Sequence, residues 1–259
     1  SLIDRAEGEI DGGQWLPVLD VEAGTSGVCL FARDEGARKR WSKALARAGR
    51  LVYLAAARGV TPAKGAITRE LRGAEGSRPA RTRYRRLAIG GGHSVLRVVP
   101  ERHHFHQIRR HLAAIGHPVL GDARYGHAPT NRYFEEKHGL DRSFLHLVRV
   151  ELDHPVSGER LLIESPLPPD LRAALTRASD DSVLRFLENK KALGGPPRRR
   201  PPDWVPPSER SPLSVVEELE PESSAYPIEP ATPSQRMPAP DMDEAPRTVR
   251  GELLTPDDD

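Results

Sequence analysis

The stretch from His106 to Gly126 constrains the fold of this chain more than any other. It begins with a polar, cation-rich segment, continues through an apolar turn and ends in a Gly-Asp-x-x-Tyr-Gly loop. His106 and Arg109 are three positions apart, so a helix would place both side chains on one face. Leu112 and Ile115 would then anchor the helix to a core. The stretch therefore predicts a short helix followed by a tight loop.

The elements on either side of this stretch mix helices and strands without strict alternation. A buried apolar run is typical of a strand, and Asp34 is a suitable N-cap for a helix. Mixed elements in this order predict an α+β domain with a mixed sheet. The expected strands are 28–32, 51–57, 84–89, 94–99, 144–152 and 159–164, and the expected helices are 34–48, the segment after His106, and 168–178, with a surface excursion at 60–80.

Composition divides the chain unevenly. Residues 196–259 hold 15 of the 25 prolines, with 7 basic and 14 acidic side chains, whereas the preceding residues carry a net charge of +9. A proline-rich, acidic segment cannot bury enough apolar surface to offset its ordering entropy. We therefore expect a folded domain at 1–180, a linker at 181–195 and a disordered acidic tail at 196–259.

The basic charge and the single cysteine limit the classes of function. Residues 69–110 contain 11 arginines and 3 glutamates, which favours a polyanionic partner. Cys29 is the only cysteine, so the chain can build neither a disulfide framework nor a cysteine zinc site, which suits a reducing compartment. No apolar run is long enough to span a bilayer and no signal peptide is visible, so we expect a cytoplasmic protein.

Four blocks together resemble the RluA-type pseudouridine synthases, which isomerise uridine within RNA. The blocks are the 106–126 stretch, Thr25-Ser26-Gly27, the strand Val52-Tyr53-Leu54-Ala55, and a C-terminal block from Leu145 to Pro168. The resemblance covers about residues 14–175 and implies the family's catalytic domain, with a central mixed or antiparallel sheet flanked by helices and loops. It also implies a uridine in structured RNA (rRNA or tRNA) as substrate, and no metal or organic cofactor. The family's opening strand is missing, so we expect an additional N-terminal domain in the full-length protein.

The resemblance assigns a catalytic role to three side chains. Tyr53 would lie against the target base, and Arg109 would pair with the nucleophilic carboxylate. The family has an aspartate three positions before its Thr-Ser-Gly, and an ungapped count from Thr25 reaches Glu22. A second alignment, with two inserted residues, makes Asp20 the alternative nucleophile. We prefer Glu22, because the loop must hold a carboxylate at a fixed place.

A glutamate at the nucleophile position has a predicted cost. Its extra methylene moves the oxygens by about 1 Å, which can reduce a rate roughly a hundredfold where geometry is tight. The sequence therefore predicts weak turnover, partly restored by Glu22→Asp. The alternative is a catalytically inactive RNA-binding or scaffold module on the same fold.

The remaining candidates concern RNA and metal binding. His106 and Gln107 match the family, His104 stands where the family has arginine, and Arg110, Arg83 and Arg85 extend the basic segment, so we expect RNA binding by the set His106, Gln107, Arg110, Arg83 and Arg85. The histidines at 103, 104, 106 and 111 have no cysteine or acidic ligand at helical spacing, so we expect no metal site. A metal-dependent hydrolase built on these histidines ranks third.

Overall fold

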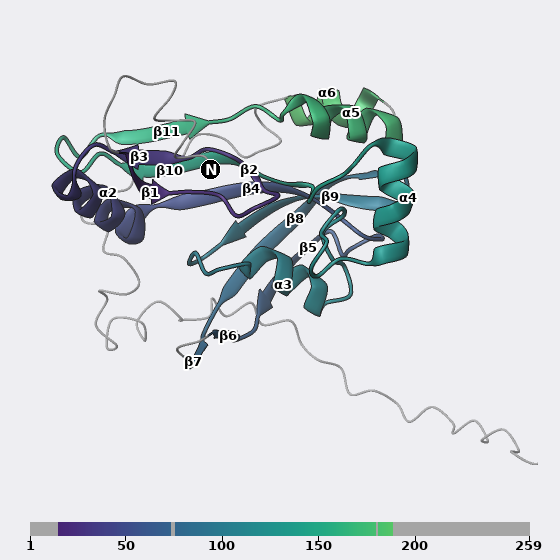
Figure 1. Ribbon diagram of the computed structural model, residues 1–259, viewed down its shortest axis with the longest axis horizontal. Coiled ribbons are helices and arrows are strands. Elements are labelled where there is room, and N and C mark those ends of the chain that lie inside the picture. Colours follow the sequence, from purple (N-terminus) through teal and green to yellow (C-terminus); the bar gives the residue numbers. More distant parts are fainter. Residues whose placement is uncertain (1–14, 74–75, 180, 189–259) are drawn as a thin grey trace, which may run out of the picture. The chain divides into compact units, whose positions relative to one another are not determined.

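A computed structural model describes residues 15–73, 76–179 and 181–188 (Figure 1). Its strands are β1 (Leu16–Leu19), β2 (Ser26–Gly27), β3 (Leu30–Ala32), β4 (Arg50–Ala57), β5 (Lys64–Thr68), β6 (Leu71–Gly73), β7 (Gly76–Arg78), β8 (Arg81–Gly90), β9 (His93–Pro100), β10 (Leu145–Asp153) and β11 (Arg160–Glu164). Its helices are α2 (Glu35–Ala48), α3 (Gln107–Ala114), α4 (Ala128–His138), α5 (Pro169–Ala178) and α6 (Asp181–Glu188). The predicted acidic tail lies outside the described residues.

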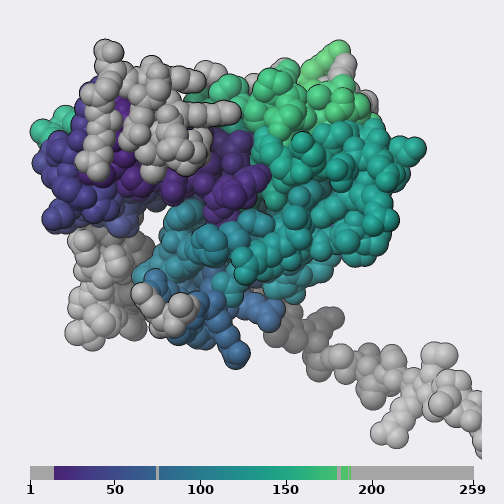
Figure 2. Space-filling model, viewed as in Figure 1, coloured from purple at the N-terminus to yellow at the C-terminus, as the bar shows by residue number. Residues whose placement is uncertain are grey.

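The central sheet has the order β11-β10-β4-β9-β8-β5. Neighbouring strands along this path are antiparallel, and β2 adds a short parallel pairing with β10. The sheet is therefore mixed, and the fold is α+β as the sequence predicted. In the space-filling view the N-terminal described segment, in purple, lies directly against the later teal segment (Figure 2).

Strand β4 is at the centre because it is apolar on both faces. All of its residues from Leu51 to Ala57 are buried. Successive side chains of a strand point to opposite faces, so alternate residues enter different clusters. Tyr53 and Ala55 pack with the cluster that contains Leu112 of α3, whereas Leu54 and Ala56 pack with Leu175 of α5 and its neighbours. Two layers of helices and loops thus cover the middle of the sheet.

Helix α2 forms where the sequence predicted it. The Asp34 carboxylate accepts a hydrogen bond from the Ala37 N–H at 2.7 Å, which satisfies one of the free donors of the first turn. Trp41 and Leu45 pack against the core that contains Tyr53. This helix follows β3, which pairs with β1, and so fixes the N-terminal segment against the sheet.

Three regions differ from the sequence analysis. The surface excursion at 60–80 contains β5, an edge strand that pairs with β8 and buries Ile67. Helix α4 was not expected, although Pro129 in its first turn and Gly139 at its end are typical helix boundaries. Helix α6 occupies 181–188, inside the segment expected to be a linker, and buries Val183 and Leu187. No helix in the described ranges is long and apolar enough to cross a membrane.

Candidate active site

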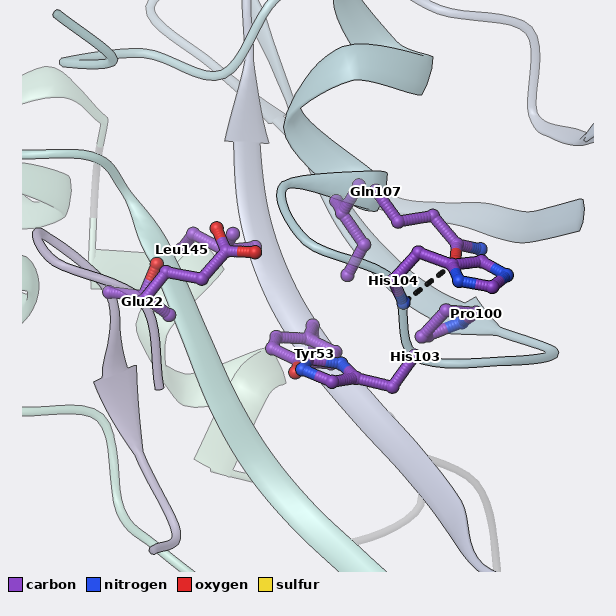
Figure 3. Close-up of a pocket in the computed structure, with 9 residues that line it drawn as sticks. Glu22, Tyr53, Pro100, His103, His104, Gln107 and Leu145 are labelled. Atoms are coloured by element: carbon purple, nitrogen blue, oxygen red, sulfur yellow. Dashed lines mark hydrogen bonds between the residues drawn. The ribbon is translucent and has the colours of Figure 1, made fainter. Parts of the chain in front are cut away.

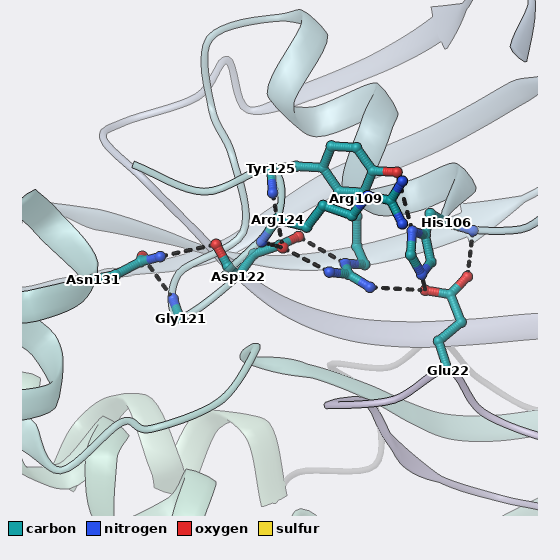
Figure 4. A network of polar contacts seen from close by, with 8 residues as sticks. All are labelled: Glu22, His106, Arg109, Gly121, Asp122, Arg124, Tyr125 and Asn131. Atoms are coloured by element: carbon teal, nitrogen blue, oxygen red, sulfur yellow. Dashed lines mark hydrogen bonds and ion pairs between the residues drawn. The ribbon is translucent and has the colours of Figure 1, made fainter. Parts of the chain in front are cut away.

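Arg109 of α3 forms the most buried ion pair of the site. Its Nε and Nη2 atoms each donate a hydrogen bond of 2.7 Å to the two carboxylate oxygens of Asp122 (Figure 4). Arg109 is 6% exposed and Asp122 is 0% exposed. A two-bonded guanidinium–carboxylate pair fixes both the position and the plane of the arginine. The orientation of Arg109 therefore depends on Asp122, a residue to which the sequence analysis assigned no role.

The Gly-Asp-x-x-Tyr-Gly loop holds Asp122 from the other side. The N–H groups of Arg124 and Tyr125 donate to its Oδ1 at 2.9 and 3.0 Å. Burial alone would raise the pKa of Asp122, but Arg109 and these two N–H groups hold that pKa below its usual range. Gly121 has a φ of +73°, and a Cβ there would meet the Arg142 carbonyl oxygen at 2.1 Å, so only glycine fits before Asp122.

Glu22 approaches Arg109 from the loop between β1 and β2. Its Oε2 lies 3.5 Å from Arg109 Nη1, and its Oε1 accepts a hydrogen bond from the backbone N–H of His106. That N–H points at the carboxylate because His106, the N-cap of α3, has a left-handed backbone with a φ of 56°. Figure 4 shows Arg109 between the carboxylates of Glu22 and Asp122.

The loop that carries Glu22 is fixed by strand β10. Gly27 and Leu147 are parallel partners, and the Val28 N–H donates to the Leu147 carbonyl at 3.0 Å. A Cβ on Gly27 would lie 2.3 Å from that carbonyl oxygen, so the two backbones can approach only because Gly27 lacks a side chain. The Ser26 hydroxyl also forms a 2.9 Å hydrogen bond with His146 Nδ1.

The two carboxylates beside Arg109 differ in their electrostatics. Burial raises the pKa of Glu22 above its usual range, although the His106 N–H and Arg109 act against this shift. Burial and nearby arginines also lower the pKa of His106, so its ring is neutral at pH 7 and its 3.7 Å contact with Glu22 is no ion pair. The negative charge of the Glu22 carboxylate is thus only partly compensated by its neighbours.

A pocket lies beside Glu22. Its walls include Tyr53 of β4 and Leu145, with Thr25, His103, His104 and Gln107 (Figure 3). Tyr53 is 4% exposed, and burial, followed by the negative charge of Glu22, raises its pKa above the usual range. The Tyr53 hydroxyl is therefore protonated at neutral pH.

Three buried polar atoms of this pocket have no hydrogen-bond partner among the described residues. They are Glu22 Oε2, Thr25 Oγ1 and His104 Nε2. A buried polar atom without a partner costs free energy, and such atoms gather at functional sites. The pocket therefore presents unpaired hydrogen-bonding groups to whatever molecule enters it.

The structure brings Glu22, Tyr53 and Arg109 together, whereas no hydrogen bond or ion pair joins Asp20 to Arg109. Asp20 is exposed and forms no ion pair with a described residue. The preceding Leu19 is 4% exposed and belongs to the core. The short contacts of the site thus involve the carboxylate of Glu22.

The five residues expected to bind RNA have different surroundings. Gln107 is 2% exposed, and its Nε2 donates inward to the Arg81 carbonyl and the Thr82 hydroxyl, both at 3.0 Å. His106 is 7% exposed and its Nδ1 lies 3.1 Å from the Tyr125 hydroxyl. Arg110 is half-buried.

Arg83 and Arg85 are exposed but do not face the pocket. The register pairs Tyr53 with Val98 and Val98 with Tyr84, so these three side chains share one face. The neighbours of Tyr84 on β8 must then point to the other face. The two arginines therefore lie on the side of the sheet opposite Tyr53.

One exposed aromatic ring stands beside the site. Phe105 is 69% exposed, and its ring stacks on His106 with a centroid distance of 3.7 Å. His106 in turn meets Tyr125 edge-on at 5.4 Å. Within the ranges that the structure describes, no group of three His, Cys, Asp or Glu side chains is placed to hold a metal ion.

Comparisons with known sequences show what this fold and constellation resemble. The sequence profile of the RNA pseudouridylate synthases matches residues 14–114, which include β1 to β9, Glu22, Tyr53 and Arg109. This part of the chain is therefore similar to the RNA pseudouridylate synthases.

Three curated relatives match parts of this chain. An uncharacterized RNA pseudouridine synthase of Chloroflexus aurantiacus is 36% identical over 182 residues, which are 65% of this chain and 56% of the relative. The ribosomal large subunit pseudouridine synthase D of Nitrosomonas europaea is 43% identical over 102 residues (39% and 30%). The tRNA pseudouridine synthase C of Salmonella typhimurium is 36% identical over 110 residues (38% and 42%). The alignments thus span between 30% and 56% of the relatives' lengths.

Solved structures agree on the fold. Human RNA pseudouridylate synthase domain containing 1 superposes with a TM-score of 0.56 at 22% identity, over 73% of this chain and 85% of that chain. Human RNA pseudouridylate synthase domain containing 4 superposes with a TM-score of 0.55 at 19% identity, over 68% of this chain and 80% of that chain. At these identities the likeness establishes the pseudouridylate synthase fold.

Proposed function

We propose that this chain isomerises uridine to pseudouridine in structured RNA, with Glu22 as the nucleophile. The observation that carries the proposal is the placement of the Glu22 carboxylate at the pocket wall, bound by the His106 N–H and 3.5 Å from Arg109. Its Oε2 has no hydrogen bond to a described residue. A carboxylate that is positioned on one side and unsatisfied on the other is suited to attack an electrophile.

The reaction needs no group from outside the chain. The carboxylate attacks C1′ of the uridine, and the bond between C1′ and N1 breaks. The uracil turns in the pocket, C5 attacks C1′, and the bond between C1′ and the carboxylate breaks. The C5 proton then leaves and N1 gains a proton. Reactants and product have the same atoms, so we propose no metal or organic cofactor.

Tyr53 and the unpaired pocket atoms would hold the target nucleotide. The aromatic face of Tyr53 is suited to stack on a uracil, and the Thr25 hydroxyl and His104 Nε2 can bond to its polar edges. A base inside a helix cannot reach such a pocket, so the target uridine would be flipped out or unpaired.

The relatives suggest where the substrate is found. Their names refer to the ribosomal large subunit and to tRNA, so we propose a uridine in rRNA or tRNA. An RNA substrate and a chain with one cysteine fit the reducing cytoplasm, which is the proposed location.

The experiment is the release of tritium from RNA that carries 5-tritiated uridine. The native chain should release tritium, and Glu22→Ala should not. The two proteins should bind RNA equally well. Equal release by both proteins would exclude Glu22 and favour Asp20. No release by the native chain from rRNA or tRNA transcripts would favour an inactive RNA-binding module.

A further inference from the structure

The face of the sheet opposite Tyr53 carries a basic surface. Its members lie on the three adjacent strands β5, β8 and β9, and we call them the back-face cations: Lys64, Arg81, Arg83, Arg85 and Arg97. Lys64, Arg81, Arg83 and Arg85 are exposed and Arg97 is half-buried. On β8 the intervening Thr82 and Tyr84 are buried, so the alternation separates a basic face from a core face.

Three of these cations form a row in register. Lys64 is the cross-strand partner of Arg85, and Arg85 is the partner of Arg97. Strands lie about 4.8 Å apart, so the three positions span roughly 10 Å across the sheet. Like charges directly opposite each other destabilise a sheet, so the row is unfavourable for folding alone.

No carboxylate forms an ion pair with this row within the described part of the chain. The side chains of Lys64, Arg85 and Arg97 have no ion pair or hydrogen bond to a described residue. Burial lowers the pKa of Arg97 and neighbouring arginines lower it further, whereas the negative charge of Glu151 acts in the opposite direction. Glu151 is itself ion-paired with Arg50 and Arg160. By contrast, Arg81 and Arg83 share Glu101 at 3.3 and 3.5 Å. The row therefore retains positive charge that no direct ion pair compensates.

We propose that the back-face cations bind the phosphate backbone of a second part of the same RNA whose uridine occupies the pocket. β5 is the edge strand of the sheet, beside β8 in Figure 1, so an RNA can pass around it from one face to the other. Lysine and arginine side chains with no aromatic ring between them are suited to bind phosphates. Phosphate contacts give affinity but carry no sequence information. The inference rests on the proposed function and deepens it: the substrate is a folded RNA large enough to reach both faces.

The test compares two triple variants with equal loss of charge. The row variant is Lys64→Gln/Arg85→Gln/Arg97→Gln, and the control is Lys39→Gln/Arg40→Gln/Lys43→Gln on the exposed side of α2. Binding is measured against salt with a folded tRNA transcript and with the single strand A-A-U-A-A. For the transcript, the slope of log affinity against log salt should fall by about 2 to 3 in the row variant, at roughly 0.7 to 0.9 per phosphate lost, and by less than about 1 in the control.

Two further readouts separate the inference from the proposed function. The short single strand should bind the row variant and the native chain equally, because it reaches only the pocket. Arg85→Gln alone, at an exposed position, should lower the transcript slope by about 0.7 to 0.9 even if the triple variant folds poorly. Equal slopes in the two triple variants would overturn the inference. They would favour an acidic protein segment as the ligand of this face. Tritium release by the native chain is scored independently, so either proposal can fail alone.

Discussion

Arg109 lies between two carboxylates that the structure treats in opposite ways. Asp122 is fully buried, accepts hydrogen bonds from Arg109 and from two backbone N–H groups, and has a lowered pKa. Glu22 accepts one backbone hydrogen bond, its Oε2 lies 3.5 Å from Arg109 Nη1 without a hydrogen bond, and its pKa is raised. A fully satisfied carboxylate is suited to hold its partner in place, whereas a poorly satisfied one is suited to react.

The comparison also shows how the site divides its tasks. The Asp122 loop follows α3 closely in sequence, so the helix and its loop form one local unit that fixes the guanidinium. Glu22 comes from a different part of the chain and meets this unit at its open side. Five predictions test whether the two carboxylates differ as described.

Removing the Glu22 carboxylate should have the largest effect. We expect Glu22→Ala to reduce tritium release by about 10⁴-fold or more, as for other enzymes that lose a nucleophile. The matched control is Asp20→Ala, which removes an exposed acid from the same loop and should change the rate less than about threefold, within the range of surface substitutions. A large loss in Asp20→Ala with normal release by Glu22→Ala would reverse the assignment.

Removing the Asp122 charge should affect the stability of the fold more directly than the rate of the reaction. Asp122→Asn leaves a buried guanidinium whose remaining carboxylate partner among the described residues is Glu22, 3.5 Å from its Nη1. We therefore expect a loss of about 3 kcal/mol in the free energy of unfolding. Urea denaturation at pH 7 measures this, with the exposed Asp141→Asn as a control that should change by less than about 0.5 kcal/mol.

The pH dependence of that loss has a definite sign. The pKa of Asp122 is lowered by folding, so its stabilisation is present above the unfolded pKa of about 3.9 and is lost as pH falls through the folded value. The native chain and Asp122→Asn should therefore converge in stability in strong acid. A difference that stays constant down to acid pH would contradict the charged role of Asp122.

Shortening Glu22 to aspartate should reduce the activity of the native chain rather than increase it. The carboxylate already reaches the His106 N–H and lies 3.5 Å from Arg109, so Glu22→Asp would withdraw its oxygens from both groups. We expect a loss of about tenfold to a hundredfold in tritium release. The sequence analysis, which assumed a loop shaped for aspartate, predicted the opposite result. A gain of activity in Glu22→Asp would favour that earlier view.

The decline of the rate at acid pH should be the smallest of these effects. A carboxylate that acts as the proposed nucleophile must be ionised, and the pKa of Glu22 lies above the ordinary value of 4.5. Tritium release should therefore decline as pH falls through this raised pKa, by about tenfold per unit below it, while RNA binding is measured in parallel. A decline that begins only at or below 4.5 would mean that burial does not perturb Glu22.

Local patterns in the sequence were sufficient for much of the fold. The N-cap Asp34 and the apolar run of β4 predicted elements that the structure contains. Strand β5 was missed, because a short edge strand with alternating Lys64, Ala66 and Thr68 on its open face resembles a surface loop. Helix α4 was missed although its proline and glycine boundaries were visible.

The site was only partly predictable for a similar reason. Counting from Thr25 reached Glu22, and the match at 106–112 reached Arg109, but the partner of Arg109 could not be read from either block. Asp122 follows a glycine in a tight loop, where an aspartate usually serves the turn itself. Likewise Arg83 and Arg85 were assigned to RNA binding from charge, whereas their alternation with Tyr84 could have placed them on the other face.

The pairing of Gly27 with Leu147 has a consequence for the time at which the protein becomes competent during its synthesis. The loop that carries Glu22 leaves the ribosome early, yet the strand that fixes it follows about 120 positions later, as the Ser26–His146 contact shows. At translation rates of about 5 to 20 residues per second, the interval is roughly 6 to 24 s. A nascent chain that has exposed Glu22 therefore lacks the strand that fixes the Glu22 loop until β10 has emerged.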